Sequence, residues 1–196
     1  MRLGLTGSIA MGKSATAAQF RALGVPVYDA DAAAHRVYAA GGAAGPAVRA
    51  IAPEAVGPDG AVDREALKRR VKVDSSFLPR LEAIVHPLVA EARASFEAEA
   101  RAAGARLAVY DVPLLFETGL AEAMDAVLVV SAPEAVQRAR ALGRAGLTEA
   151  MLDKILERQT PDAEKRARAD FVLDTSKGHD HAKAEVERIV KVLLSG

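Results

Sequence analysis

Residues 7–14 combine two glycines, a lysine and a serine at a spacing that suits phosphate binding. They read Gly-Ser-Ile-Ala-Met-Gly-Lys-Ser and fit the pattern G-x-x-x-x-G-K-[ST]. A short apolar run at 3–6 precedes them and a helical stretch at 15–20 follows, which is the context that such a loop requires. We expect Gly7 and Gly12 to adopt positive φ and to bring the backbone close to an anion. The segment therefore predicts a P-loop that binds a nucleoside triphosphate.

Each further residue of this loop has an expected task. The amides from Met11 to Ala15 should point inward at the N-terminus of a helix, where the helix dipole favours negative charge. Lys13 would place a mobile positive charge on the β- and γ-phosphates, and the Ser14 hydroxyl can ligate Mg²⁺. The loop alone does not name a reaction, because switches, motors and kinases share it.

Composition sets wider bounds. The chain has 196 residues, of which 51% are hydrophobic and 27% charged, so we expect one globular domain, residues 1–196, with a real core. Lysine plus arginine and aspartate plus glutamate both number 26, and this balance argues against a nucleic-acid-coating protein. There is no cysteine, no secretory signal and no apolar run of 18 residues or more, which predicts a cytoplasmic protein that does not span a membrane. Nothing in the sequence points to an obligate protein partner.

Strand-like and helical segments alternate along the chain. Apolar runs predict five strands, and helical patterns fill the gaps between them; the strands are expected at 3–6, 25–29, 107–111, 126–130 and 171–173, and the helices at 15–20, 32–38, 133–142, 148–159 and 181–194. This order implies a three-layer α/β/α fold with a five-stranded parallel sheet and the ligand at the carboxyl ends of its strands.

Residues 46–104 lack a convincing strand and predict a helical insertion that covers the substrate. Asp63 is expected to cap one helix that runs through Val71. A long helical region over 77–103 should be interrupted at His86-Pro87, because proline disfavours helix at the residue before it.

Asp29-Ala30-Asp31 lies at the expected carboxyl end of the second strand. A carboxylate at this place could deprotonate a hydroxyl that attacks the γ-phosphate, or could hold Mg²⁺ through water. The plainer alternative is that Asp31 caps the helix that follows it. We favour the functional interpretation for Asp31 and keep the cap as its alternative.

The segment 111–117, Asp-Val-Pro-Leu-Leu-Phe-Glu, leaves the third strand on the same edge. Asp111 stands where P-loop enzymes keep an acid that orders Mg²⁺. Leu114, Leu115 and Phe116 make this loop too apolar for simple exposure. They could pack under the helical insertion, form a wall against an organic acceptor, or do both.

Arg138, Arg140 and Arg144 follow the fourth strand. Arg140 and Arg144 are four residues apart and share one face if the helix continues. Gly143 and Gly146 interrupt the pattern, which suits a lid segment over 138–150 whose arginines neutralise charge in the transition state. The alternative is a solvated charged face.

Two histidines have a possible role in ligand binding. His86 precedes a proline that could face a cleft, although a lone histidine is more often structural. His35 comes one helical turn after Asp31 and would face the same side. No set of histidines and acids has the spacing of a zinc site.

With these pieces in order, the chain resembles the dephospho-coenzyme A kinase family over essentially its whole length. The resemblance lies in the loop at 5–14, in Asp29-Ala30-Asp31 with His35, in 81–87, in 111–117, in Gln137-x-x-Arg140-x-x-x-Arg144, and in Arg158-Gln159, Glu164-Lys165 and Ala169-Asp170. The His-Pro segment and the Asp-x-Pro-Leu-Leu-Phe-Glu loop are the most specific of these.

This resemblance implies ATP-dependent phosphorylation of the ribose 3′-hydroxyl of dephospho-CoA, which gives CoA and ADP. By analogy Asp31 would be the base, Arg140 and Arg144 the lid arginines, and 46–104 the CoA-side insertion. Dephospho-CoA would contact a set of residues near the base and the third strand, namely Asp31, His35, His86, Asp111, Leu115, Phe116 and Glu117. ATP would contact the loop residues Gly7, Ala10, Met11, Gly12, Lys13, Ser14 and Ala15 together with Thr175, and Mg²⁺ would bind Ser14 with a water-mediated Asp31 or Asp111.

The chain departs from the family pattern at three positions. Ala10 replaces a usual glycine and Ala15 a common threonine, and neither change matters to the mechanism provided that Ala10 has a negative φ. Thr175 stands where the family tends to have an asparagine near a glycine, so base selectivity is open. Two other classes compete with this reading: another P-loop small-molecule or nucleoside monophosphate kinase, and a nucleotide-driven switch, although no N-K-x-D motif is present.

Overall fold

The computed structural model describes residues 1–195, and its contacts divide the chain into two compact units. Residues 1–28 and those from Ala100 onward form the first unit, and Asp29–Glu99 form the second. The predicted bounds of a 46–104 insertion and a 138–150 lid stay predictions.

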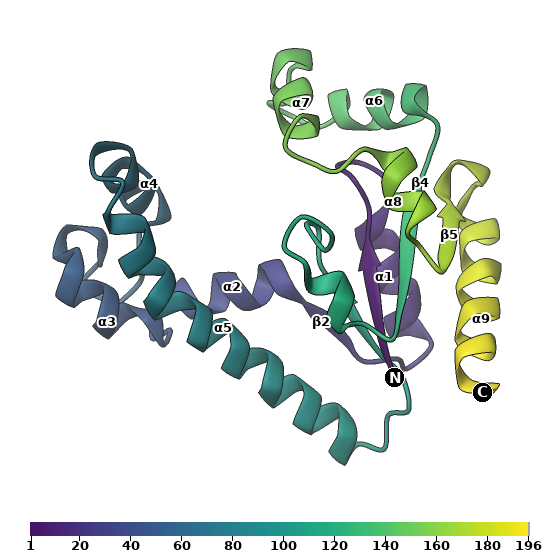
Figure 1. The fold of residues 1–196 in the computed structure, drawn as a ribbon, viewed down its shortest axis with the longest axis horizontal. Helices are drawn as coiled ribbons and strands as arrows, with labels where there is room; N and C mark the ends of the chain where they lie inside the picture. Colours follow the sequence, from purple (N-terminus) through teal and green to yellow (C-terminus); the bar gives the residue numbers. More distant parts are fainter. Residues whose placement is uncertain (196) are drawn as a thin grey trace. The chain divides into compact units, whose positions relative to one another are not determined.

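The first unit is built on a five-stranded sheet, which confirms the expected fold class (Figure 1). The strands are β1 (Arg2–Thr6), β2 (Val27–Asp29), β3 (Ala108–Asp111), β4 (Ala126–Ser131) and β5 (Phe171–Asp174). Their order is β2-β3-β1-β4-β5, and β1 pairs in parallel with β3 and β4, as β4 does with β5. All six residues of β4 are buried, which explains why this run is apolar without alternation.

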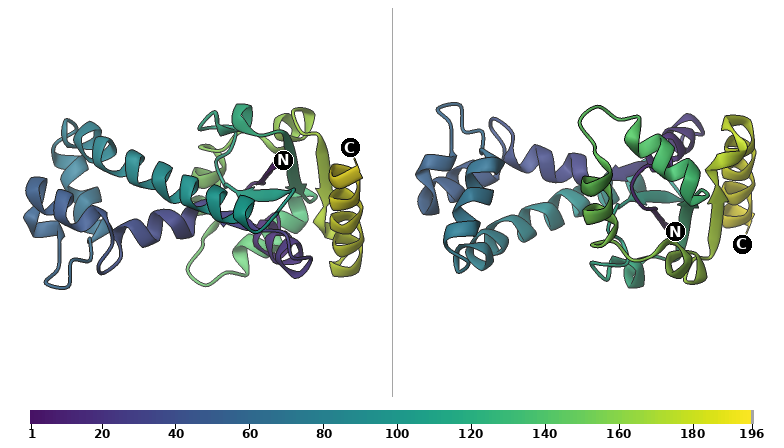
Figure 2. Two further views of the ribbon diagram at one scale, coloured as in Figure 1. Left: turned by 90° about the horizontal axis from the view of Figure 1, so that it is seen from below. Right: turned by 90° about the horizontal axis from the view of Figure 1, so that it is seen from above.

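Five helices belong to the first unit: α1 (Lys13–Ala22), α6 (Glu134–Leu142), α7 (Glu149–Leu156), α8 (Asp162–Ala167) and α9 (His179–Ser195). Two 3₁₀ turns, Leu120–Ala123 and Thr175–Lys177, complete it. In both views of Figure 2, α9 runs beside β5, and it also contacts α1. The core between sheet and helices includes Leu5, Phe20, Leu128, Val186 and Ile189, all fully buried.

The second unit contains helices only, apart from a 3₁₀ turn at Pro53–Ala55 and one isolated bridge between Val56 and Val62. The helices are α2 (Ala30–Tyr38), α3 (Ala44–Ile51), α4 (Arg64–Val73) and α5 (Phe77–Ala102). They share a separate core that includes Val48 and Phe77. Asp63 caps α4 as predicted, because its carboxylate accepts from the backbone N–H groups of Glu65 and Ala66.

Two predictions about helices were wrong. Helix α5 is not interrupted, because Pro87 lies inside it. Proline deletes one helical hydrogen bond, but His86 and Pro87 are exposed and water can satisfy the freed carbonyl, while Leu81 and Val85 hold the helix through core packing. The helix predicted over 148–159 ends earlier, because α7 stops at Leu156, and α8 was not predicted. Within residues 1–195, no helix is both long and apolar enough to cross a membrane.

Candidate active site

The phosphate-binding loop joins β1 to α1 and presents unsatisfied backbone donors. Helix α1 begins at Lys13, and Gly12 caps it with a φ of 93° and without a side-chain hydrogen bond. The first amides of a helix have no partner within the helix. The amides of Lys13, Ser14 and Ala15 can therefore point at an anion, and the helix dipole adds to their attraction.

The two loop glycines are required for different reasons. Gly12 has the positive φ that was predicted for both, but Gly7 does not. A Cβ on Gly7 would lie 2.4 Å from Val130 Cγ2 and 2.6 Å from the Val130 carbonyl oxygen. The prediction of positive φ at Gly7 was wrong, because the residue is glycine to let β4 approach the loop.

Ala10 and Met11 also differ from expectation. Ala10 has a φ of 63°, so the condition of a negative φ is not met, and the left-handed conformation costs roughly 1 kcal/mol in a residue with a Cβ. The Met11 N–H donates to the Ser8 carbonyl at 3.2 Å and does not join the predicted row of inward amides. The Met11 side chain is 1% exposed and belongs to the core of the first unit.

Two glutamines hold the loop in place. Gln137 Nε2 donates to the Ile9 carbonyl at 2.9 Å, and the Ile9 N–H donates to Gln159 Oε1 at 3.1 Å. Both peptide groups of Ile9 are thus fixed by side chains 128 and 150 residues further along the chain. Both glutamines lie in segments that resemble the family, but no role was predicted for them. The spacing of residues along the sequence does not indicate contacts between such distant positions.

Lys13 and Asp111 form an ion pair at the edge of the sheet. Lys13 Nζ lies 2.5 Å from Asp111 Oδ1, and the Asp111 side chain is only 5% exposed. Leu5 and Asp111 are paired residues of adjacent parallel strands, which explains how the end of β3 reaches the loop that follows β1. The structure therefore brings together the two groups that the sequence predicted separately.

The oxygen atoms near this pair suit Mg²⁺. Ser14 stands exposed in the first turn of α1, next to Lys13, and Asp111 supplies a carboxylate. Within residues 1–195 no group of three acids and histidines could hold a metal by itself. Mg²⁺ commonly binds one or two protein oxygens together with substrate phosphates, so Ser14 and Asp111 are candidate ligands.

Arg140 and Thr175 connect three elements beside the loop. Arg140 donates to Thr175 Oγ1 at 2.8 Å and to its carbonyl at 2.9 Å, and Thr175 Oγ1 donates to the Met11 carbonyl at 2.9 Å. Thr175 also lies against Gly12, whose hypothetical Cβ would be 3.1 Å from Thr175 Cγ2. These contacts explain how α6 and the turn after β5 reach the phosphate-binding loop.

Arg144 is placed differently from Arg140. Helix α6 ends at Leu142 with Gly143 as its cap, so the condition for a shared helical face is not met and the predicted interruption at Gly143 is observed. Arg144 is exposed, and its side chain has no hydrogen bond or ion pair within residues 1–195. Gly146 has a φ of 80°, which supports the predicted loop.

The segment after β3 packs against α8. Leu115 is fully buried and Phe116 is 7% exposed, and the Arg168 guanidinium lies 4.5 Å from the Phe116 ring centre. Leu114, at 41% exposure, is the residue of the three that faces outward. Leu115 and Phe116 are therefore buried within the first unit, while packing under the helical insertion and a wall against an acceptor both stay predictions.

Glu117 is held by two partners. Its Oε1 lies 2.9 Å from the Nζ of Lys165, which is fully buried, and accepts the Thr160 N–H at 2.7 Å. Burial alone would raise the pKa of Glu117, but the hydrogen bonds from Lys165 and from the backbone N–H groups of Glu117 and Thr160 outweigh burial and lower this pKa. Glu117 is therefore ionised and anchors its loop to α8.

The second unit carries Asp31, His35 and His86. Asp29 caps α2, because its Oδ1 accepts the Ala32 N–H at 2.8 Å, so the alternative that Asp31 is the cap was wrong. Asp31 stands in the first turn of α2, exposed, with His35 one turn further on and also exposed. His86 is exposed on α5, and the helix break expected beside it is not present.

Comparisons with known proteins decide the family. The family model described as dephospho-CoA kinase matches residues 1–181. A dephospho-CoA kinase of Cereibacter sphaeroides is 54% identical over 189 residues, which are 96% of this chain and 93% of that protein. A dephospho-CoA kinase of Mesorhizobium japonicum is 52% identical over 97% of this chain and 95% of its own length. The chain belongs to the dephospho-CoA kinase family.

Solved structures agree with this membership. A Thermus thermophilus protein of known crystal structure superposes with a TM-score of 0.80 and 36% identity, over 100% of this chain and 96% of that one. A dephospho-CoA kinase from Campylobacter jejuni has a TM-score of 0.68 at 20% identity and supports the fold. The family identifies the chain as a P-loop kinase, and neither the switch nor another small-molecule kinase is favoured.

Proposed function

We propose that this chain transfers the γ-phosphoryl group of ATP to the ribose 3′-hydroxyl of dephospho-CoA, giving CoA and ADP as the last step of coenzyme A biosynthesis. The observation that carries the proposal is the site around the phosphate-binding loop. Free helix amides, the Lys13–Asp111 pair and Arg140 converge there, in a chain that belongs to this kinase family over residues 1–181.

The bond changes assign a task to Asp31. The 3′-oxygen attacks the γ-phosphorus, the bond from that phosphorus to the β,γ-bridging oxygen breaks, and ADP leaves with the electron pair. Asp31 accepts the proton of the hydroxyl as a new O–P bond forms. Two observations support this assignment: Asp31 follows the end of β2, a strand of the same sheet, and Asp29 already caps α2.

The residues around the phosphates have electrostatic tasks. Lys13 would lie against the β- and γ-phosphates, and the helix amides would hold the phosphate oxygens before the reaction starts. Ser14 and Asp111 would hold Mg²⁺, with Asp31 as the alternative carboxylate, and the metal would neutralise charge on the phosphates. Arg140 and Arg144 would add positive charge from the 138–150 segment in the transition state.

The remaining substrate contacts are proposals of the same kind. His35 and His86 are exposed and could meet dephospho-CoA directly. The segment that would face the acceptor is anchored in the first unit by three residues, Leu115, Phe116 and Glu117. We propose that these residues hold the segment in position for the acceptor. The even charge balance supports a small-molecule substrate and no nucleic-acid partner, and the absence of cysteine is typical of a cytoplasmic enzyme. We propose no obligate protein partner.

An acceptor panel tests the proposal. ADP release would be measured by a coupled assay with ATP and Mg²⁺ in the presence of dephospho-CoA, shikimate, gluconate or a nucleoside monophosphate. We expect release that depends on dephospho-CoA and yields CoA in equal amount. Release with another acceptor and none with dephospho-CoA would overturn the proposed substrate.

A further inference from the structure

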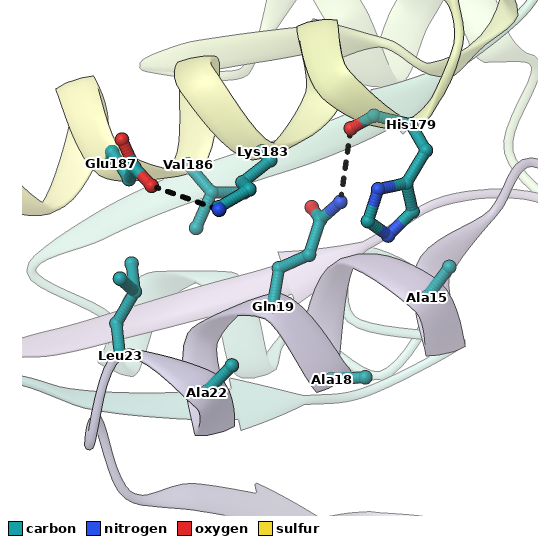
Figure 3. A pocket seen from close by; sticks show the side chains of 9 residues that line it. All are labelled: Ala15, Ala18, Gln19, Ala22, Leu23, His179, Lys183, Val186 and Glu187. Carbon is teal, nitrogen blue, oxygen red and sulfur yellow. Dashed lines mark hydrogen bonds and ion pairs between the residues drawn. The ribbon is translucent and has the colours of Figure 1, made fainter.

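Two cavities lie between α1 and α9 and share a wall. The first, of about 340 Å³, is lined by loop residues together with Arg140, Arg144 and Thr175. The second, of about 610 Å³, continues along α1 toward Ala22 and Leu23 (Figure 3). Three residues line both cavities: Ala15, Gln19 and His179.

Gln19 is the polar residue of this wall that lacks a full set of partners. It is 8% exposed, and its Nε2 donates to the His179 carbonyl at 3.4 Å. Figure 3 shows its side chain rising from α1 toward that carbonyl. Its Oε1 is buried and has no hydrogen-bond partner within residues 1–195. A buried acceptor without a donor is unfavourable, so this atom calls for a donor from a ligand.

The orientation of the Gln19 amide follows from its neighbour. Exchanging the amide oxygen and nitrogen would set Oε1 against the His179 carbonyl oxygen, and two acceptors repel each other. The His179 carbonyl therefore fixes Nε2 in its place. The atom left without a partner is therefore an acceptor, not a donor, and it belongs to a residue that lines both cavities.

The smaller cavity adjoins the phosphate-binding loop, because Ala10, Gly12, Ala15 and Thr16 line it. A nucleotide whose phosphates lie on this loop has its base within reach of such a cavity, whose volume suits a purine. Adenine carries an exocyclic amine that donates, whereas guanine carries a carbonyl oxygen that accepts at the corresponding position. An available acceptor on the wall thus favours adenine and disfavours guanine.

Thr175, which the family resemblance places near the nucleotide base, already has other hydrogen bonds. The Thr175 hydroxyl donates to the Met11 carbonyl and accepts from Arg140. It therefore links the phosphate-binding loop to α6, and Gln19 is the side chain of the smaller cavity whose acceptor is still unused.

We propose that Gln19 determines base selectivity: its Oε1 accepts a hydrogen bond from the exocyclic amine of adenine in the cavity beside Gly12 and Arg140. The proposal rests on the proposed function, since it concerns the phosphate donor of that reaction. It replaces Thr175 as the residue that distinguishes ATP from GTP.

The ratio of kcat/KM for ATP to kcat/KM for GTP tests this, with dephospho-CoA as acceptor. Gln19→Met keeps the length of the side chain and removes the acceptor. We expect kcat/KM for ATP to fall about tenfold while that for GTP stays within about twofold, because one hydrogen bond is lost with ATP and none with GTP. Ala22→Leu is the control, since Ala22 lines only the larger cavity and should leave the ratio unchanged.

Several outcomes would overturn the proposal. An equal fall of kcat/KM with both nucleotides would make Gln19 a structural residue. Unchanged values of kcat/KM with both nucleotides would remove Gln19 from base recognition. A shift of the ratio by Ala22→Leu would place the base in the larger cavity. Calorimetric binding of ATP and of GTP without acceptor gives the same comparison independently, so a chain that does not phosphorylate dephospho-CoA still tests Gln19.

Discussion

The phosphate-binding loop and the first turn of α2 hold their functional candidates in opposite ways. Lys13 is paired with Asp111, and both peptide groups of Ile9, in the same loop, are hydrogen-bonded to glutamine side chains. Asp31 is exposed, and its side chain has no hydrogen bond or ion pair within residues 1–195. Contacts within the protein fix the loop, and fixed donors suit electrostatic stabilisation. Asp31 is left available for the proton of a substrate, as a base must be.

The largest effect is expected at Lys13. Lys13→Met should lower kcat by about three powers of ten, because the transferring group loses its fixed positive partner. The change also leaves the Asp111 carboxylate buried without its cation, so the free energy of unfolding should fall by about 3 kcal/mol. Steady-state kinetics and urea unfolding measure the two effects.

A double variant separates the two effects of Lys13. Lys13→Met with Asp111→Asn removes both charges, so we expect most of the stability to return while turnover stays low. If the double variant recovered turnover together with stability, Lys13 would serve only to neutralise Asp111. Lys13 would then have no role in the reaction to compare with that of Asp31.

Asp31→Asn should give the next largest effect. We expect kcat to fall by about two powers of ten with an unchanged Tm, because the base is lost and no cap is disturbed. The matched control is Asp29→Ala, which removes the observed cap and should cost about 1 kcal/mol of stability. A large loss of stability in Asp31→Asn would return Asp31 to a structural task.

The two regions also differ in how far the sequence could predict them. The strands, the loop and the placement of Lys13 and Asp111 at one edge of the sheet follow from local patterns and from the geometry of parallel strands, whereas their ion pair was not predicted. The bonds from Gln137 and Gln159 to Ile9 could not be predicted, because they join segments more than a hundred residues apart. The alternative interpretation placed the cap on Asp31 instead of Asp29, because both are good capping residues and only backbone geometry distinguishes them.

The continuity of α5 and the φ of Ala10 show another limit of sequence patterns. Pro87 disfavours the interior of a helix, and Ala10 disfavours a positive φ. Tertiary packing outweighs such preferences, and its strength cannot be inferred from neighbours in sequence.

Glu117 is a second fixed residue of the first unit, and its contribution to stability should depend on pH. Its lowered pKa in the folded state means that it contributes stability above its ordinary pKa of 4.5, and that this contribution is lost as pH falls through the lower folded value. Glu117→Gln should therefore cost about 2 kcal/mol at pH 7, because the buried Lys165 loses its ion-pair partner. The difference from the unmutated chain should shrink below about pH 4.5.

Unfolding by urea at several pH values tests this prediction, with Lys165→Met/Glu117→Gln as the companion variant. Removing both partners should cost less than Glu117→Gln alone, because no unpaired charge stays buried. A cost for Glu117→Gln that does not change with pH would show that the ion pair does not anchor this loop.

The arginines should give a smaller effect on turnover. Arg140→Lys or Arg144→Lys should lower kcat by somewhat more than tenfold, because lysine lacks the planar fork that binds phosphate oxygens at two points. Binding of dephospho-CoA without nucleotide should not change. Hydrogen exchange over 138–150 should be fast without ligands and slow with both bound. Full activity in both variants, together with equal exchange in both states, would reduce these arginines to a solvated face.

The smallest effect is expected at Ala10. In Ala10→Gly, relief of the left-handed conformation gains roughly 1 kcal/mol, while the lost methyl burial and the greater freedom of glycine in the unfolded chain cost roughly 1 kcal/mol each, so the net cost should be roughly 1 kcal/mol. Ala17→Gly is the matched control, because Ala17 is fully buried within α1, where glycine brings no relief and should cost roughly 2 kcal/mol. Urea unfolding of both variants gives the comparison. If Ala10→Gly were as destabilising as Ala17→Gly, the loop would not be strained at Ala10, and its shape would be as relaxed as the helix that follows it.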